Sequence, residues 1–281
     1  GTNHQYMLFF TQKGKCFWMR VYEIPEGSRT SKGRAIQNLI NIEQDDKVKA
    51  FICTKDLKDD NYINNHFVIM ATKKGQVKKT SLEQYSRPRV NGINAITIKE
   101  DVELLEAKLT DGNSQVMLAL KSGKAIRFEE AKTRPMGRNA SGVRGIRLQH
   151  DKDEVIGMVA VNDMESNILV VSSNGYGKRS SYLDYRVTNR GGKGIIGIVN
   201  SPRNGNISSS LVVYETDEII LSTLEHHANI VPWHFLRSRK GIKLIWIDPD
   251  ENGQISLDMI EKKISSKTKM ACITHMSNVF G

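Results

Sequence analysis

The sequence predicts a mainly β fold: a partial propeller-like array of about four units, followed by a short α/β segment. Three observations support this prediction. A strand–turn–strand pattern occurs four times, a second glycine follows each turn glycine at a nearly constant distance, and the pattern changes to alternating helix and strand near residue 217. A period of about 50–60 residues, built from short strands and Gly-rich turns, is typical of radial arrays whose units bury their apolar faces against one another.

Each unit begins with two short strands joined by a tight turn. In the clearest copy, residues 115–128, an apolar strand leads to Ser122-Gly123 and then to a strand that carries basic residues. Gly suits such a turn because it has no Cβ and therefore adopts positive φ without a clash. The turn glycines of the four copies are Gly14, Gly75, Gly123 and Gly175.

The second glycine of each unit closes a basic, turn-rich segment. These glycines are Gly33, Gly92, Gly142 and Gly194, 17 to 19 residues after the turn glycines. After each of them the chain returns to a short apolar strand, and acidic linkers such as residues 43–46 and 58–61 separate the units. We expect few or no helices in residues 1–200.

The basic segments are the predicted DNA contacts. In any single loop, glycines that serve turns and solvated cations would explain the composition equally well. Four such loops at equivalent places would instead form a stripe of guanidinium groups and backbone N–H groups that binds phosphates. No aromatic residues interleave with them, which favours duplex DNA over stacked single strands. The predicted contacts are Arg29, Lys32, Arg34, Arg87, Arg89, Arg134, Arg138, Arg144, Lys178, Arg179, Arg186, Arg190 and Lys193.

The net charge supports a polyanionic partner. It is +10 for the chain, and residues 218–281 hold eight Lys or Arg against seven Asp or Glu, so nearly all of the surplus lies in residues 1–217. Such an excess is typical of proteins that bind nucleic acid.

Other classes of protein are disfavoured. No apolar run approaches the roughly 18 residues of a membrane span, and no signal-peptide pattern is present. The three cysteines, Cys16, Cys53 and Cys272, fit neither a disulfide framework nor a zinc site. We therefore expect a cytoplasmic protein without a metal site.

Three segments resemble the C-terminal domain of the A protein of bacterial DNA gyrase: residues 22–34, 134–138 and 174–179. The resemblance covers about residues 1–217. It implies a β-pinwheel domain over residues 1–216, incomplete at both ends, since the family has about six blades. It also implies binding of double-stranded DNA without sequence preference, with bending or wrapping along a basic perimeter. The family's A protein works with a B protein in an ATP-dependent type II topoisomerase that adds negative supercoils near the bacterial nucleoid.

Two departures from the family limit what the resemblance implies. The family's signature box would lie upstream of this sequence, and residues 188–194 look like a degenerate internal counterpart. The domain with the catalytic tyrosine is absent, so we expect no enzymatic activity from this chain alone. The paralogous C-terminal domain of the topoisomerase IV A protein remains an alternative.

Residues 217–281 follow a different pattern, in which a helix predicted at 255–264 alternates with apolar strands. Residues 225–233 and 273–281 resemble the cofactor domain of class V aminotransferase-like cysteine desulfurases. The resemblance implies that His226 stacks on pyridoxal phosphate (PLP) and that Asn278 contacts its phenolic oxygen. The match is a fragment without the family's cofactor lysine or sulfur-accepting cysteine, so we expect vestigial contacts only, no bound cofactor and no desulfurase activity.

The junction raises the question of how the two parts came together. Both families have similar residues near positions 217–221, which suggests a spliced or misassembled reading frame. A PLP-enzyme fragment with a β-rich extension is the alternative interpretation of the whole chain. Because the tail holds only part of its parent sheet, we expect residues 222–281 not to share the core of the repeats.

Overall fold

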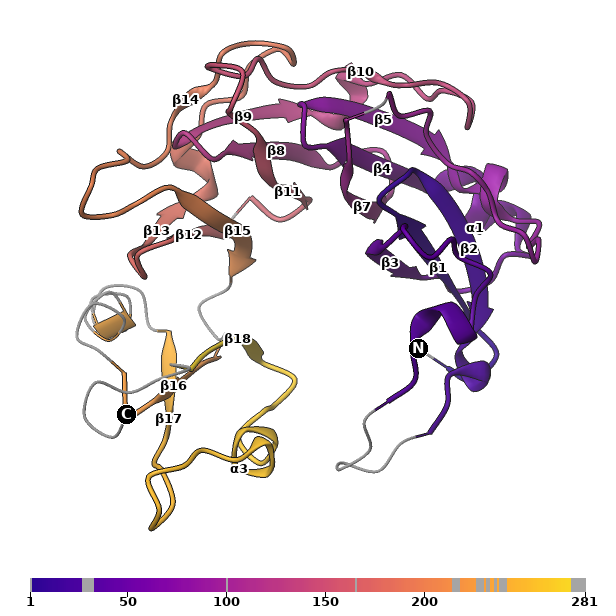
Figure 1. Cartoon of the computed structure of the whole chain (residues 1–281). Coiled ribbons are helices and arrows are strands. Elements are labelled where there is room, and N and C mark those ends of the chain that lie inside the picture. Colours follow the sequence, from indigo (N-terminus) through magenta and orange to yellow (C-terminus); the bar gives the residue numbers. More distant parts are fainter. Residues whose placement is uncertain are drawn as a thin grey trace. The chain divides into compact units, whose positions relative to one another are not determined.

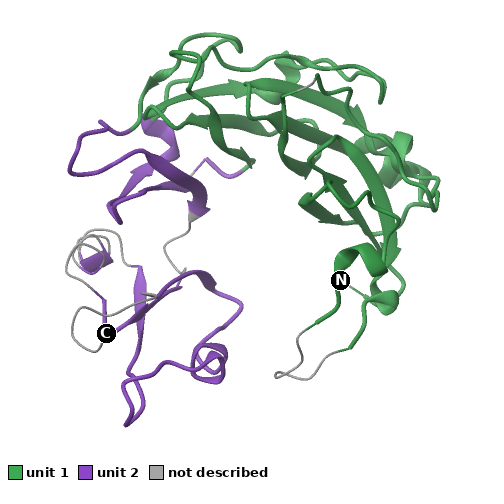
Figure 2. Cartoon of the chain, in the orientation of Figure 1, with its two compact units in different colours: residues 1–162, 185–197 green, residues 163–184, 198–281 purple. Residues whose placement is uncertain are grey.

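The computed structural model describes residues 2–26, 33–99, 101–164, 166–213, 218–225, 230, 233–234, 237 and 242–273. The chain forms two compact units (Figures 1 and 2): unit 1 contains residues 1–162 and 185–197, and unit 2 contains residues 163–184 and 198–281. Unit 2 thus includes much of the fourth repeat as well as the tail. The described residues include no helix with the length and apolar character needed to cross a membrane.

Unit 1 contains three antiparallel four-stranded sheets, each built around one of the predicted hairpins. The hairpins are β1 (Tyr6–Thr11) with β2 (Lys15–Arg20), β4 (Phe67–Thr72) with β5 (Gln76–Ser81), and β8 (Gln115–Leu120) with β9 (Lys124–Glu129). One edge of each sheet is a long strand: β3 (Val48–Cys53), β7 (Leu104–Thr110) or β11 (Val155–Val161). The other edge is a strand of two residues: β6 (Ile93–Asn94), β10 (Val143–Arg144) or β14 (Ile195–Ile196).

Each two-residue strand comes from the repeat that follows. β6 pairs with β2, β10 with β5 and β14 with β9, so that Ile93 lies opposite Cys16 and Ile195 opposite Ala125. Figure 1 shows β10 and β14 along one edge of the row of sheets, with β7 and β11 along the opposite edge. Successive repeats are therefore linked by exchanged strands as well as by packing, which the sequence pattern did not reveal.

Both predicted sets of glycines adopt the left-handed conformation. The turn glycines have φ of 84°, 82°, 94° and 79°, and the second glycines have φ of 67°, 65°, 84° and 72°. The positive φ expected at the turn glycines is confirmed, and the second glycines also adopt positive φ.

Helical structure in unit 1 is short, as expected. Single 3-10 turns follow the hairpins, namely η1 (Val21–Glu23), η3 (Leu82–Tyr85) and η4 (Glu130–Lys132), and η2 (Ile36–Asn38) lies in the first linker. The helix α1 (Asp60–Asn65) occupies the second linker. Its N-cap, Asp59, accepts hydrogen bonds from the backbone N–H groups of Asn61 and Tyr62.

The core of unit 1 lies between consecutive sheets. Because successive side chains of a strand point to opposite faces, one hairpin strand serves two cores. Leu8 and Phe10 pack with Val68 and Met70, whereas Ile69 and Ala71 pack with Val116 and Leu118. This is the stacking of neighbouring units that the repeat pattern predicts.

Unit 2 contains two three-stranded sheets. The fourth repeat supplies β12 (Asn167–Ser172), β13 (Gly177–Ser181) and β15 (Ile207–Val213), with η5 (Tyr182–Asp184) after the hairpin. The tail supplies the parallel strands β16 (Glu218–Ser222), β17 (Lys243–Ile247) and β18 (Thr268–Cys272), with α3 (Leu257–Glu261) between the last two. Parallel strands with an intervening helix agree with the predicted α/β character.

The expectation that residues 222–281 do not share the core of the repeats is wrong. Leu169 of β12 shares one hydrophobic cluster with Ile219, Leu221 and Trp233 of the tail. Leu169 lies six residues before its turn glycine, the same place that Leu8 and Ile69 have in their repeats. Those two residues face the next sheet, so β12 needs a partner on this side, and the parallel sheet of the tail covers it.

Candidate nucleic-acid interface

The basic segments become three loops at the edge of unit 1 where strands are exchanged. We call residues 86–96, 133–146 and 185–197 the rim loops. Each carries a second glycine that passes close to the preceding sheet: a Cβ on Gly142 would lie 2.5 Å from the carbonyl oxygen of Val77, and one on Gly194 would lie 2.6 Å from that of Ala125. Only glycine permits this approach without displacing the exchanged strand.

The turn glycine of the preceding repeat receives each rim loop. The carbonyl of Gly14 accepts hydrogen bonds from Ala95 N (2.8 Å) and Ile96 N (3.1 Å). In the same way, the carbonyl of Gly75 accepts from Gly145 N and Ile146 N, and that of Gly123 from Gly197 N. The loops are therefore fixed at equivalent places in successive sheets.

Consecutive rim loops are also bonded to each other. Gly191 N donates to the carbonyl of Gly145 (2.6 Å), and the side chain of Arg190 donates to the carbonyls of Lys132 (2.9 Å) and Arg144 (3.2 Å). The loops of residues 86–96 and 133–146 meet where Thr97 N, just beyond the former loop, donates to the carbonyl of Ala140 (3.2 Å). Arg190 is half-buried, which makes it more a connector between loops than a free cation.

The predicted contacts fall into four groups. Exposed are Arg34, Arg87, Arg89, Arg134, Arg144, Arg186 and Lys193 of unit 1 and Lys178 on β13 of unit 2, and half-buried are Arg138 and Arg190. Arg29, Lys32, His226 and Asn278 lie outside the described residues. Arg179 is buried, with 6% of its surface exposed, because its position on β13 points inward, and we withdraw it as a DNA contact.

Carboxylates neutralise the cations at the hairpin turns but not those of the rim loops. Glu43 accepts from Lys13 (2.8 Å) and Lys15 (2.6 Å), which lower its pKa to about 2. Glu103 pairs with Lys73 (2.7 Å) and Glu154 with Lys121 (3.1 Å). Among the described residues, the ion pairs found include no arginine of the rim loops. The acidic linkers thus leave the surplus positive charge on the rim.

A third class of cation lies inside the sheets. Lys79 pairs with the buried Glu130 (3.0 Å), and Arg127 donates to the side chain of Gln115 and to the carbonyl of Tyr185 (2.9 Å). Lys78 is fully buried, and its Nζ donates to backbone carbonyls. These residues stabilise the sheets and loops and do not face a ligand.

Lys78 is expected to make the free energy of unfolding increase with pH between about 7 and 10.5. Burial and the neighbouring Arg138 lower the pKa of Lys78 from 10.5 to about 7 in the folded chain. In this range the unfolded chain binds a proton that the folded chain does not, so stability rises with pH. Denaturant unfolding at pH 7, 8 and 9 should show this rise as a changing difference between wild type and Lys78→Met. A difference that is constant across this range would contradict the assignment.

Gly142→Ala is expected to destabilise unit 1 more than Gly33→Ala. Both glycines have positive φ, at 84° and 67°, so both variants carry a backbone strain of roughly 1–2 kcal/mol. The Cβ at Gly142 meets the backbone of Val77, whereas no atom of the described residues lies within 4 Å of a Cβ at Gly33. The clash should add about 1–3 kcal/mol. Chemical denaturation of the two variants measures the difference, and equal losses would rule out the close approach at β10.

One hollow on the rim contains cations that the sequence analysis missed. Lys74 and Lys99, with Arg144 of β10, line a cavity of about 390 Å³. Lys99 lies beyond the second glycine of its repeat, and Lys74 precedes a turn glycine, so neither falls inside the basic segments. A search for basic residues on either side of the turn glycine and the second glycine would have identified Lys74 and Lys99.

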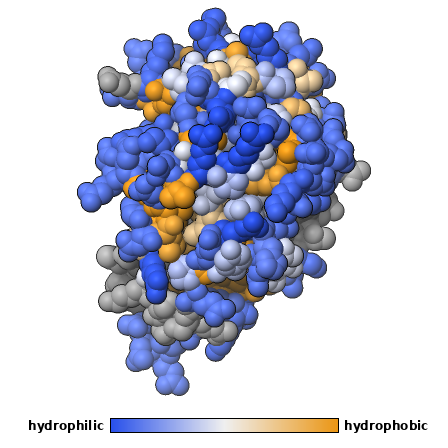
Figure 3. All heavy atoms as spheres, turned by 90° about the vertical axis from the view of Figure 1, so that its right-hand side faces the viewer, coloured by the Kyte–Doolittle hydropathy of each residue, from blue (hydrophilic) through white to orange (hydrophobic). Residues whose placement is uncertain are grey.

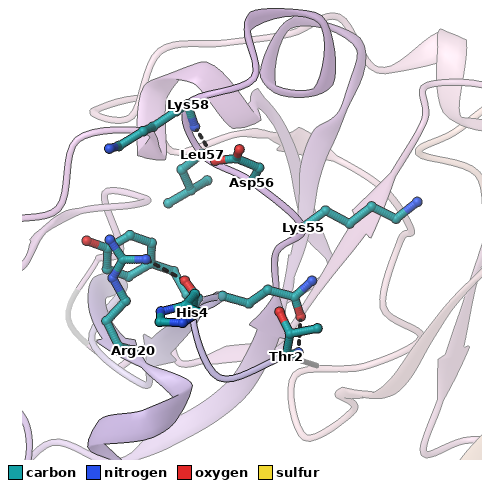
Figure 4. A pocket seen from close by; sticks show the side chains of 9 residues that line it. Thr2, His4, Arg20, Lys55, Asp56, Leu57 and Lys58 are labelled. Atoms are coloured by element: carbon teal, nitrogen blue, oxygen red, sulfur yellow. Dashed lines mark hydrogen bonds between the residues drawn. The ribbon is translucent and has the colours of Figure 1, made fainter.

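A second hollow, of about 260 Å³, lies near the N-terminus (Figure 4). Arg20 stacks on the ring of Tyr6 (3.7 Å to its centroid) and donates to the carbonyl of His4. Lys55 and Lys58 extend away from each other (Figure 4), so the cations do not converge on one point. The surface in Figure 3 is mostly hydrophilic with smaller apolar areas, and we assign no ligand site on it. The described residues include no group of three or more His, Cys, Asp or Glu suited to a metal ion.

The described part of the tail does not fit PLP. Lys262, Lys263, Lys267 and Lys269 are exposed, at the end of α3 and around β18. Covalent cofactor chemistry requires an enclosed lysine together with phosphate-binding groups. We expect that titration with PLP gives no absorbance band that survives dialysis. A stable band with one of these lysines labelled after borohydride reduction would overturn this expectation.

Comparisons with known proteins agree with the repeat structure. The family model described as "DNA gyrase C-terminal domain, beta-propeller" matches residues 5–55, 66–111, 116–162 and 166–213, one segment in each repeat. The family model described as "Aminotransferase class-V" matches residues 205–281.

Curated relatives and solved structures resemble the same part of the chain. The DNA gyrase A protein of Staphylococcus epidermidis is 42% identical over 223 residues, which are 79% of this chain and 24% of the relative. The Staphylococcus aureus protein is 40% identical over 79% of this chain and 25% of its own length. The chain thus spans about a quarter of the length of these relatives. The solved C-terminal domain of DNA topoisomerase IV has a TM-score of 0.68 and 26% identity, covering 76% of this chain and 65% of that one. A DNA gyrase A C-terminal domain has a TM-score of 0.64 and 22% identity, covering 77% and 68%, and supports the fold alone.

Proposed function

We propose that this chain, which belongs to the DNA gyrase C-terminal domain family, binds duplex DNA without sequence preference along the rim loops and bends it. The separation of charge in unit 1 carries this proposal. Carboxylates pair with the turn lysines, whereas the exposed arginines of the rim loops have no carboxylate partner among the described residues. Cations presented in this way bind the phosphates of a polyanion.

Duplex DNA is a better match to this surface than a single strand. The rim loops present arginine, lysine and backbone N–H groups, and their one aromatic residue, Tyr185, is buried. Single-strand binding relies on exposed aromatic rings on which bases stack. A duplex that follows loops on successive sheets must bend, and smooth bending of a 20–30 base-pair site costs on the order of 1–6 kcal/mol, which phosphate contacts can offset.

Binding to long linear duplexes of two unrelated sequences, between about 50 and 200 mM salt, tests the proposal. Roughly four to eight phosphate contacts predict a log–log slope of about −4 to −7, with little difference between the sequences. A flat salt response, or strong discrimination between the duplexes, would contradict it.

Within a longer protein, we propose that this chain serves the A protein of an ATP-dependent type II topoisomerase in the bacterial cytoplasm. The partners would be the core of gyrase A together with gyrase B, and the cutting chemistry would lie outside this chain. The likeness to a topoisomerase IV domain supports a second candidate, in which DNA is bent without a full wrap. Relaxing circular DNA in the presence of the chain separates the two, because only wrapping leaves a change of linking number.

The hybrid character of the chain is a further proposal. The two family matches support a gyrase-like part, residues 1–216, followed by an aminotransferase-like part, residues 217–281. Sequencing the native locus across codons 205–230 tests whether one uninterrupted reading frame encodes both.

A further inference from the structure

Lys78 is a buried lysine beneath the rim. It lies on β5 between two rim loops, with none of its surface exposed. Its Nζ donates to the carbonyl of Ala95 (2.5 Å) and to the carbonyl of Arg138 (2.5 Å). A buried amino group, charged or neutral, requires such acceptors, because leaving its N–H groups unpaired would cost their desolvation without compensation.

The two acceptors belong to different repeats. Ala95 ends the rim loop of the second repeat, and Arg138 lies in the rim loop of the third. The Cβ of Lys78 also lies 3.2 Å from where a Cβ on Gly142 would be, so its side chain begins directly below the loop of residues 133–146. One buried side chain therefore joins two consecutive loops.

Other side chains also join the two loops, but at exposed positions: Asn94 Nδ2 donates to Asn139 Oδ1 (3.2 Å), and Thr97 Oγ1 donates to the Asn139 carbonyl (2.7 Å). Tyr85 donates to the same Ala95 carbonyl (3.4 Å), but its hydroxyl reaches only one loop. Burial raises the pKa values of Tyr85 and Cys16, so both stay neutral near pH 7, and Arg138 is the charged neighbour. Lys78 is therefore the buried link between the loops, and the hydrogen bonds at Asn94 and Thr97 are exposed links.

We propose that Lys78 is a positioning residue for DNA binding, which touches no DNA and helps to hold the rim loops of residues 86–96 and 133–146 at the spacing that a bent duplex requires. This inference rests on the proposed function of the rim. Without Lys78, the duplex must order the loops as it binds, and ordering lowers affinity.

Salt titration distinguishes a positioning role from direct contact. Lys78→Met should bind a long linear duplex roughly fivefold to tenfold more weakly at every salt concentration, because the loops must be ordered on binding. The log–log slope should stay the same, since no phosphate contact is removed. A residue that contacts phosphate would lower the slope by about 1 when replaced. Unchanged affinity, or a lower slope, would overturn the proposal.

Leu104→Ala is the matched control for loss of stability. Leu104 is fully buried on β7 and packs in the core between the first and second sheets. The strand β4 separates β7 from β5, so the substitution removes core atoms away from the strand that carries Lys78. Under conditions in which circular dichroism shows both variants folded, Leu104→Ala should bind DNA like wild type. An equal loss of affinity in both variants would mean that Lys78 acts through general stability.

Hydrogen exchange tests the loop contact without DNA. Lys78→Met should speed exchange of the amides in residues 87–96 and 134–142 relative to the rest of unit 1, and Leu104→Ala should not. If wild type shows no salt-dependent DNA binding, the proposed function fails, yet this measurement still decides whether Lys78 holds the loops. Equal protection of these loops in wild type and Lys78→Met would overturn the proposal.

Discussion

Replacing Arg87, Arg89, Arg134 and Arg144 together by Ala is expected to weaken binding of duplex DNA by about 100-fold to 1,000-fold near 150 mM salt. These arginines are exposed, lie on two consecutive rim loops and have no carboxylate partner among the described residues. Each lost phosphate contact lowers the log–log salt slope by about 0.9, so the slope should fall by about 3 to 4. Fluorescence anisotropy with a long labelled duplex measures both quantities.

A second set of four cations provides the matched control. Lys13, Lys15, Lys73 and Lys121 lie at hairpin turns and pair with carboxylates of the acidic linkers. Replacing them by Ala removes the same formal charge from unit 1, but we expect the slope to change by less than about 1. If both quadruple variants lose affinity equally, binding follows net charge and the rim has no special role.

Ending the chain after residue 217 is expected to remove the cooperative unfolding of the fourth repeat. The truncation uncovers Leu169 on β12, which packs against Ile219, Leu221 and Trp233. A sheet with one apolar face in water has lost the burial that stabilises it. Hydrogen exchange should show fast exchange throughout residues 166–213, with protection kept in residues 6–129. Full protection of the fourth repeat in the shortened chain would refute the capping role of the tail.

Point substitutions test the same contact in the intact chain. Leu169→Ala should cost about 2–5 kcal/mol, the usual range for a buried leucine. Leu257→Ala, on the exposed face of α3 with 73% of the leucine surface accessible, should change stability by less than about 0.5 kcal/mol. If Leu169→Ala lost as little stability as Leu257→Ala, burial of Leu169 against the tail would not stabilise the chain.

The repeats were predictable because glycine and alternating apolar residues report local geometry. Gly123 and Gly142 needed positive φ, and the pattern of residues 115–128 required a hairpin. The exchange of strands was not predictable in this way. Val143 and Arg144 look the same in sequence whether they pair within their own sheet or with β5 of the preceding repeat. That choice depends on the close approach of Gly142 to Val77, a tertiary contact that leaves no local pattern.

The sequence predicted which types of residue form the site, but not which of their side chains are exposed and which are buried. Sequence identified Arg87 and Arg134 as rim cations because they stand beside turn residues, and both are exposed. It could not separate them from Arg179, because a basic residue on a strand looks alike whether it faces water or the interior. Nor did it assign a role to Lys78, whose buried contacts are to backbone carbonyls of two distant segments.

The exchanged strands fix the order in which the sheets are completed while the ribosome synthesises the chain. The sheet around β1 is complete only when Ile93 and Asn94 have emerged, and the sheet around β4 must wait for Val143 and Arg144. The sheet of each repeat is therefore completed only after the next repeat has been synthesised, because that repeat supplies the missing edge strand. A nascent chain arrested after residue 140 would carry a finished first sheet and a second one still open at β5. When synthesis stalls within one repeat, the preceding repeat is fully translated but its sheet still has an unpaired edge. That preceding repeat is therefore the part of the nascent chain that is prone to aggregate.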